Sequence, residues 1–167
     1  LFSRDVIALS TAVGLSHNVF DAAICLGVCD KIVPGMVIGS LSFGHLPIAF
    51  IPAGPMPTGI SNADKNEVRK KFANGEVDRS TLISTEQAAY HSSGTCTFYG
   101  TANTNQLIME VMGLQLPSSS FVSPESTERQ LIIDRTVKAV LDLKNDGMKT
   151  GEMLTSKSWV NGMVGLI

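Results

Sequence analysis

The sequence predicts an α/β fold in which helices cover a parallel or mostly parallel sheet. Two short apolar runs, residues 22–28 and 47–51, are typical of buried strands. Between them, after the turn expected at Pro34–Gly35, residues 36–45 are apolar and rich in small residues, which favours a closely packed helix. The order strand, helix, strand is that of a βαβ unit, whose strands are continuously apolar because both faces are covered.

Apolar residues at helical spacing, together with capping residues and terminating glycines, predict further helices. A loop is expected at residues 118–127, and the last ten residues resemble the first turns of a buried helix capped by Ser158 or Asn161. The predicted helices span residues 3–14, 62–72, 78–90, 101–113 and 128–147.

Composition excludes several classes of protein. The 167 residues suffice for one domain with a core, and we see no repeat or linker that would divide residues 1–167. A net charge of −2 gives no sign of the basic face that nucleic-acid binding requires. No apolar run is long enough to span a bilayer, and no signal peptide is visible. An odd number of cysteines, three, favours reduced thiols in the cytoplasm over a disulfide framework.

The two ends of the sequence have the character of cut points. The chain begins without Met on an apolar pair and finishes in an apolar run. We therefore expect residues 1–167 to be an incomplete, internal piece of one domain of a longer protein.

The first candidate site is the stretch "GVCDKIVPG". Cys29, Asp30 and Lys31 follow the first predicted strand, and ligands of open α/β sheets gather beyond the carboxyl ends of strands. Sulfur suits iron or zinc, whereas oxygen suits magnesium or manganese. The alternative is a buried cysteine followed by a surface ion pair.

The second candidate is Cys96, in the stretch "YHSSGTCTFYG". Flanking Gly94 and Gly100 let the backbone approach a ligand, and Thr95 and Thr97 are placed to donate hydrogen bonds to sulfur. A nucleophilic role would need a base, for which His91 is the candidate. Two distant loop cysteines at strand ends favour shared metal ligation, but the residues alone leave both interpretations open.

Other reactive or charged residues favour structural roles. Cys25 lies inside the first predicted strand and is expected in the core. His17 and His45 are candidate substrate contacts, although lone histidines are more often structural. The basic cluster at residues 69–71 is expected to be a solvated helix face.

Three motifs together resemble the dihydroxy-acid and sugar-acid dehydratase family. They are "GLSHNVFDAAICLGVCDKIVPG", "LSFGHLPIAFIPAGPM" and "YHSSGTCTFYGTANTNQ…MEVMGLQLPSSSF", and they occur in the family's order. The stretches "CTFYGTANTNQ" and "FGHLP" resemble the phosphogluconate branch of the family.

This resemblance implies an iron–sulfur enzyme. Cys29 and Cys96 would ligate a 4Fe-4S cluster, and Asp30 would be a ligand of Mg²⁺, as in the dihydroxy-acid branch. Lys31, which that branch can carry in carbamylated form, would be a metal ligand with a catalytic role. The family's acidic metal-binding motif and its base-bearing C-terminal domain would lie outside these residues.

The implied reaction is the dehydration of 6-phospho-D-gluconate to 2-dehydro-3-deoxy-6-phospho-D-gluconate, in the Entner–Doudoroff pathway. We expect a small phosphorylated sugar acid as the partner molecule, no nucleic-acid or membrane partner, and a homodimer of the full-length protein. Three alternatives stay open: another dehydratase of the family, a non-catalytic α/β binding domain, and a cysteine–histidine hydrolase or transferase.

Overall fold

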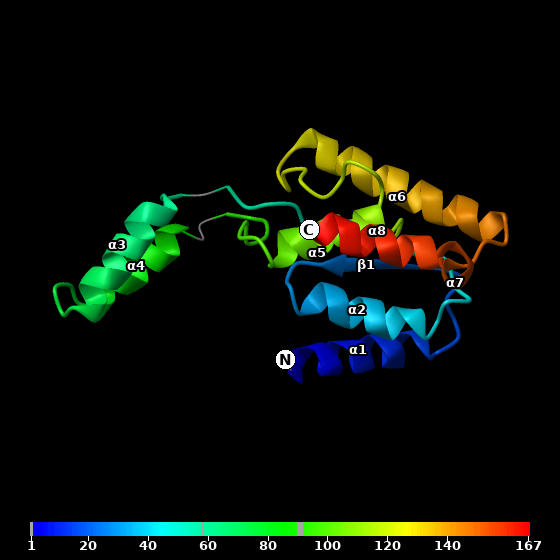
Figure 1. The fold of residues 1–167 in the computed structure, drawn as a ribbon. Coiled ribbons are helices and arrows are strands. Elements are labelled where there is room, and N and C mark those ends of the chain that lie inside the picture. Colours follow the sequence, from blue (N-terminus) through cyan, green and yellow to red (C-terminus); the bar gives the residue numbers. More distant parts are fainter. Residues whose placement is uncertain (1, 58, 90–91) are drawn as a thin grey trace. The chain divides into compact units, whose positions relative to one another are not determined.

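A computed structural model describes residues 2–57, 59–89 and 92–167. The chain divides into two compact units. The larger unit combines Leu1–Pro55 with Gly94–Ile167, and the smaller unit is the intervening segment Met56–Ser93. Both are drawn as ribbons in Figure 1. That residues 1–167 all belong to one domain of a longer protein stays a prediction.

The larger unit contains a parallel pair of strands and helices, which confirms the α/β class. Its elements in chain order are α1 (Phe2–Leu15), β1 (Ala23–Gly27), α2 (Ile32–Leu41), β2 (Ile48–Pro52), α5 (Ala102–Val111), α6 (Thr127–Asn145), α7 (Thr150–Met153) and α8 (Ser156–Leu166). Helix α1 packs on α2, α2 contacts β1, α6 contacts both strands, and α5 packs on α8. Figure 1 shows α2 and α6 on opposite sides of β1.

The two strands form the predicted βαβ unit with α2 as the crossover helix. Their register runs from Ala23 opposite Ile48 to Gly27 opposite Pro52. A segment that follows α5 continues the parallel arrangement, because Phe50 pairs with Gln115 and its N–H donates to the carbonyl of Leu114 at 2.8 Å. Strand ends that point the same way therefore meet at one edge of the sheet, which we call the carboxyl edge.

Helix α2 begins earlier than predicted. The turn expected at Pro34–Gly35 is wrong, because both residues lie in the first turn of a helix that begins at Ile32. Proline is tolerated there, since the first N–H groups of a helix have no intrahelical acceptor. A Cβ added to Gly39 would lie 2.5 Å from the carbonyl oxygen of Ala8, so the predicted close-packed face is confirmed as the contact with α1.

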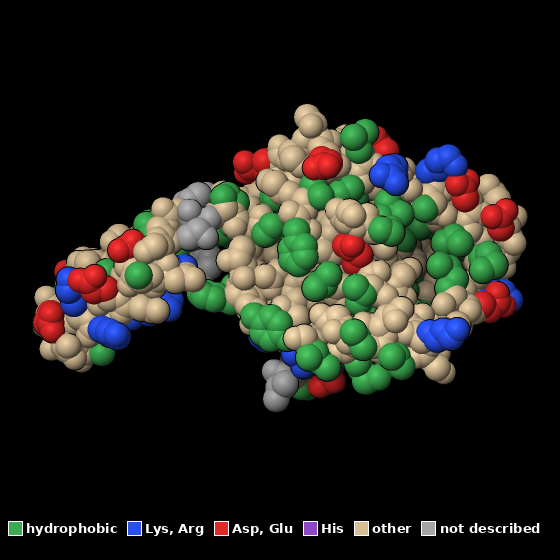
Figure 2. Space-filling model, turned by 45° about the horizontal axis from the view of Figure 1, so that its top comes forward, with side chains coloured by type: hydrophobic (Ala, Val, Ile, Leu, Met, Phe, Trp, Pro, Cys, Tyr) green, Lys and Arg blue, Asp and Glu red, His purple; other side chains and the backbone are tan. Residues whose placement is uncertain are grey.

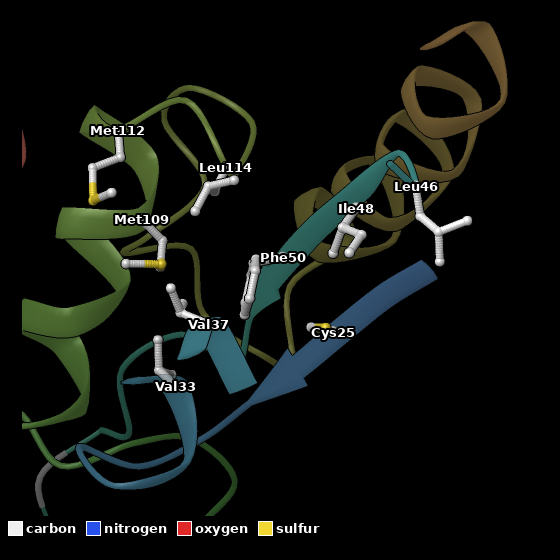
Figure 3. Close-up of a cluster of buried hydrophobic side chains, with 9 residues drawn as sticks. All are labelled: Cys25, Val33, Val37, Leu46, Ile48, Phe50, Met109, Met112 and Leu114. Carbon is white, nitrogen blue, oxygen red and sulfur yellow. The ribbon is translucent and has the colours of Figure 1, made fainter. Parts of the chain in front are cut away.

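The core lies between the sheet, α2 and α5 (Figure 3). Phe50 projects from β2 toward the methionines of α5 and its C-terminal end, and the valines of α2 complete the cluster. Cys25 is 5% exposed in β1, which confirms it as a core residue. The cluster consists of Cys25, Val33, Val37, Leu46, Ile48, Phe50, Met109, Met112 and Leu114.

The C-terminal part of the chain differs from the prediction in two ways. The short helix α7 was not predicted, and α8 begins at Ser156 with Thr155 as its N-cap rather than Ser158 or Asn161. Ser158 instead completes a capping box, in which its hydroxyl accepts from the N–H of Thr155 at 3.3 Å. The helix is largely exposed rather than buried, with Trp159 and Met163 among its exposed apolar residues.

Hydrophobic side chains reach the surface of the larger unit at several places (Figure 2). They include Phe2, Val6, Leu9 and Val13 of α1, which recur at intervals of three and four residues.

None of the helices in the described ranges has the combination of length and hydropathy that a bilayer span requires.

The smaller unit contains the helices α3 (Asn62–Ala73) and α4 (Arg79–Ala89), which pack on each other. Ser61 caps α3 by accepting from the N–H of Asp64 at 3.1 Å. The basic cluster is confirmed as a solvated helix face. Arg69 pairs with Glu86, Lys71 pairs with Glu67, each at 2.6 Å, and all four side chains are at least one-third exposed.

Candidate functional site

The two cysteine-bearing loops lie beside neighbouring strand ends. Cys29 follows the end of β1 by two residues, as predicted. Cys96 follows Thr95, which pairs with Pro55 just beyond the end of β2. Because Gly27 and Pro52 are register partners, Cys29 and Cys96 lie in segments near the same carboxyl edge of the sheet.

In the loop after β1, Cys29, Asp30 and Lys31 interact with one another. The thiol of Cys29 donates to Oδ1 of Asp30 at 3.1 Å, and Nζ of Lys31 lies 2.6 Å from Oδ2. The hydrogen bond from Lys31, reinforced by that from Cys29, holds the pKa of Asp30 below its ordinary value. Asp30 is therefore a carboxylate with both oxygens engaged, and its partner Lys31 is 44% exposed.

Thr95 joins the Cys96 loop to the residues that directly follow β2. Both the N–H and the hydroxyl of Thr95 donate to the carbonyl of Gly54, at 2.8 and 3.1 Å. The expectation that the Thr95 hydroxyl donates to sulfur is therefore wrong, because that hydroxyl is used to anchor the loop. Gly94 and Gly100 have positive φ angles, of 121° and 78°, so the loop uses the conformational freedom expected of them.

The first turn of α5 closes the loop from its other side. The hydroxyl of Thr101 donates to the carbonyl of Cys96 at 3.1 Å, and Nδ2 of Asn103 donates to the carbonyl of Thr97 at 2.8 Å. These bonds explain why "TANTN" follows the cysteine directly: short polar side chains at the start of the helix satisfy the carbonyls of the loop.

The three cysteines fall into two environments. Cys29 and Cys96 are free and partly exposed, whereas Cys25 is buried with its sulfur 3.6 Å from the hydroxyl of Ser40. Burial raises the pKa of the Cys25 thiol, which opposes formation of the thiolate that binds metals. Cys29 and Cys96 are therefore the thiols suited to a soft metal centre.

The histidines do not join this arrangement within the described residues. His17 comes before β1 and His45 comes before β2, so both are near the amino ends of the strands, away from the carboxyl edge. His45 is exposed and contacts the ring of Phe43. His91, the candidate base for a nucleophilic Cys96, lies outside the described residues.

The donor set fits part of an iron–sulfur centre. Thiolates are the ligands of such clusters, and two free cysteines lie in segments near one edge of the sheet. No group of three His, Cys, Asp or Glu residues in the described part of the chain is arranged to hold a metal ion. A cluster held by Cys29 and Cys96 would therefore need a further ligand from elsewhere.

Comparison with known proteins identifies the family. Residues 1–167 match the family described as dihydroxy-acid/6-phosphogluconate dehydratase, N-terminal. The chain belongs to this dehydratase family. It is 56% identical to the phosphogluconate dehydratase of Pseudomonas aeruginosa and 53% identical to that of Escherichia coli K12, over its whole length in both cases. It is 32% identical to the dihydroxy-acid dehydratase of Clostridium botulinum, over 98% of its length.

The chain spans only 28% of the length of each of these phosphogluconate dehydratases, and 30% of the dihydroxy-acid dehydratase. It accordingly contains a portion of a dehydratase rather than the length of one.

Sequence reasoning missed the residues that support the two loops of this dehydratase segment. Gln106 donates through Nε2 to the carbonyl of Gly27 at 3.3 Å, and Nη1 of Arg129 donates to the carbonyl of Pro52. Burial lowers the pKa of Arg129. Gln106 stood inside the quoted "TANTNQ" motif, but its acceptor is 79 residues away in the sequence. Nothing in the sequence indicated the contact of Arg129 with Pro52, because the only prediction for this residue was its place in an amphipathic helix.

Proposed function

We propose that the protein containing this chain is a hydro-lyase that dehydrates 6-phospho-D-gluconate to 2-dehydro-3-deoxy-6-phospho-D-gluconate, a step of the Entner–Doudoroff pathway. The observation that carries the proposal is the position of two free, partly exposed cysteines in segments near one edge of the sheet. It occurs in a chain that is more than half identical, over its whole length, to phosphogluconate dehydratases. The lower identity to a dihydroxy-acid dehydratase favours the sugar acid as substrate.

Cys29 and Cys96 would hold an iron–sulfur cluster, of the 4Fe-4S type in this proposal. Such a cluster, when bound, supplies a Lewis acid for a hydroxyl that is otherwise a poor leaving group. Both cysteines lie in segments near the carboxyl edge of the sheet, which would let one centre bind both thiolates. The hydrogen bond from Cys29 to Asp30 must be given up when the thiol loses its proton, which leaves Oδ1 of Asp30 free.

Asp30 and Lys31 would form a second, oxygen-rich part of the site. As an ammonium group, Lys31 neutralises the carboxylate of Asp30. Carbamylation would replace that positive charge with a carboxylate, leaving two neighbouring anions that a hard divalent cation such as Mg²⁺ would balance. Lys31 is sufficiently exposed, at 44%, to be modified in this way. In this carbamylated form, Lys31 would take the catalytic role that the family resemblance implies.

The overall reaction removes the C2 proton and the C3 hydroxyl as water and leaves an enol that rearranges to the 2-keto product. The net change needs no external oxidant or reductant. The base that takes the C2 proton is expected outside this chain, together with the remaining metal ligands. We further propose that the full-length enzyme is a cytoplasmic homodimer that acts without a nucleic-acid or membrane partner.

The substrate assignment is tested with the full-length protein, purified and assayed without oxygen. We expect turnover of 6-phosphogluconate, detected as its 2-keto product, and little or none of 2,3-dihydroxyisovalerate. Non-phosphorylated gluconate serves as the control for the phosphate group. Preferred turnover of dihydroxyisovalerate would move the protein to the other branch, and absence of any dehydration by iron-loaded protein would refute the enzymatic proposal.

A further inference from the structure

The last carbonyl of each strand is held by a side chain from a helix. Gly27 ends β1 and accepts from Gln106 of α5, while Pro52 ends β2 and accepts from Arg129 of α6. These two carbonyls belong to register partners at the carboxyl edge. Immediately beyond them the chain leaves toward Cys29 on one side and toward the Gly54–Thr95 pairing on the other.

Helix α5 is connected to both cysteine loops. Its N-terminal residues bind the loop after Cys96, through the bonds of Thr101 and Asn103 to backbone carbonyls. About one turn further along, Gln106 binds Gly27, two residues before Cys29. The distance between the two loops is therefore set by this helix and the Gln106 amide, together with the pairing of β1 with β2 and of Thr95 with Gly54.

The Gln106 amide is a costly group to bury. Its side chain is 1% exposed, and Oε1 has no hydrogen-bond partner among the described residues. A buried, unpaired acceptor costs about 1–3 kcal/mol, whereas the one hydrogen bond formed by Nε2 contributes about 1 kcal/mol. An apolar side chain would remove this unpaired acceptor, but it would also leave the carbonyl of Gly27 without this donor, so the amide acts by holding that carbonyl.

We propose that Gln106 is a positioning residue that fixes the Cys29 loop relative to the Cys96 loop. By holding the carbonyl of Gly27 it keeps the thiol of Cys29 within the narrow range of positions from which both cysteines reach one metal centre. The functional meaning rests on the proposed ligation by Cys29 and Cys96. The positional effect itself is a property of the polypeptide and is measurable without any cluster.

The test uses the full-length protein in its cluster-free form, with its exposed cysteines other than Cys29 and Cys96 replaced by serine. Nitroxide labels on Cys29 and Cys96 report the distance between the loops by pulsed electron paramagnetic resonance. The key variant is Gln106→Met, which keeps the side-chain length and removes the amide. The matched control is Gln115→Met, because Gln115 is also buried and also has an unpaired Oε1, but binds Ser120 rather than a residue next to either cysteine.

We expect a narrow distance distribution in the parent and in Gln115→Met, and one about twofold broader in Gln106→Met, since functional groups need a supporting shell to stay within about 0.5 Å of their working positions. Gln106→Asn, whose amide is one methylene too short, should behave like Gln106→Met. Equal broadening in the Gln115 control, no broadening in either Gln106 variant, or unfolding of both Gln106 variants would overturn the proposal.

A second measurement separates this inference from the proposed function. Unlabelled proteins with their native cysteines are reconstituted anaerobically with iron and sulfide, and cluster loss to a chelator is followed by absorbance. We expect loss about tenfold faster in Gln106→Met than in Gln115→Met, the size typical of changes next to metal ligands. A parent that binds no iron refutes the proposed function but leaves the distance result standing. A stable cluster with unchanged loop distances in Gln106→Met overturns the positioning role alone.

Discussion

The loop that carries Cys96 is anchored by several hydrogen bonds from residues close to it in the sequence, whereas the loop that carries Cys29 has a long-range connection through one side chain of a distant helix. Thr95 pairs with Gly54 through two hydrogen bonds, and the first turn of α5 binds the carbonyls that follow. The Cys29 loop has the local contact with Asp30 and Lys31, and its long-range connection to α5 is the Gln106 amide. The comparison shows that the two cysteines are supported by different numbers of hydrogen bonds, so the loss of one bond should matter more for the Cys29 loop.

The largest effect is expected from a change in the Cys96 anchor, Gly54→Ala. Gly54 has a φ angle of 81°, and an added Cβ would collide with the carbonyl oxygen of Val122. Strain and overlap together should destabilise the region by at least about 3 kcal/mol. Hydrogen exchange of the full-length protein, measured by mass spectrometry, should show loss of protection around Thr95.

Gly113→Ala is the matched control for this change. Gly113 has a similar φ angle of 87°, but open space surrounds the position of its Cβ. Its cost should be about 1 kcal/mol, from the left-handed backbone alone. Equal costs for the two variants would show that the close approach of Gly54 to Val122 contributes nothing to the anchor.

A smaller effect is expected from Glu110→Gln, which acts on the loop that follows α5. Glu110 accepts from the N–H groups of Ser118, Ser119 and Ser120 and from the Ser120 hydroxyl. Ser120 in turn contacts the carbonyl of Gln106 at 3.1 Å. Replacing the carboxylate should cost about 2 kcal/mol at neutral pH, the range for hydrogen bonds to a charged group.

The same interaction gives a pH dependence with a definite sign. Burial alone would raise the pKa of Glu110, but the hydrogen bonds from Ser120, Ser118 and Ser119 lower it below its ordinary value of 4.5. The carboxylate therefore contributes its full stability above pH 4.5 and loses it as the pH falls through the lowered value. The stability difference between wild type and Glu110→Gln, from urea unfolding, should shrink over this range. A difference independent of pH would contradict this account.

The smallest effect is expected from Thr95→Val in the Cys96 anchor. This change removes the hydroxyl bond to Gly54 and keeps the N–H bond, so it should cost about 1 kcal/mol. Thr97→Val, at an exposed neighbouring position, should change stability by less than about 0.5 kcal/mol. Local hydrogen exchange of the loop compares the two. If Thr97→Val has the larger effect, the anchor has been assigned to the wrong hydroxyl.

The sequence was informative wherever the signal is local. The apolar runs predicted both strands, and the position of Cys25 inside one of them predicted its burial. The order strand, helix, strand was sufficient to predict that the two strands are parallel and that Cys29 follows the carboxyl end of the first strand.

The errors and omissions concern residues whose role depends on distant partners or on helix ends. Pro34–Gly35 has the composition of a turn, but packing against α1 makes it part of a helix. The hydroxyl of Thr95 was expected to donate to the sulfur of Cys96. Its actual acceptor, the carbonyl of Gly54, is 41 residues away in the sequence, so no local pattern indicates the bond. Gln106 is next to Gly27 only in the folded chain, so no spacing rule reveals the contact.

The central claim is that Cys29 and Cys96 hold one iron–sulfur cluster while Cys25 is a core residue. The direct test is the iron content and visible absorbance of the full-length protein after anaerobic reconstitution, in the wild type and in Cys25→Ser, Cys29→Ser and Cys96→Ser. The account predicts that Cys25→Ser retains the iron of the wild type, and that each of the other two variants loses it together with the colour. Full iron in Cys29→Ser or Cys96→Ser, or its loss in a folded Cys25→Ser protein, would contradict the account.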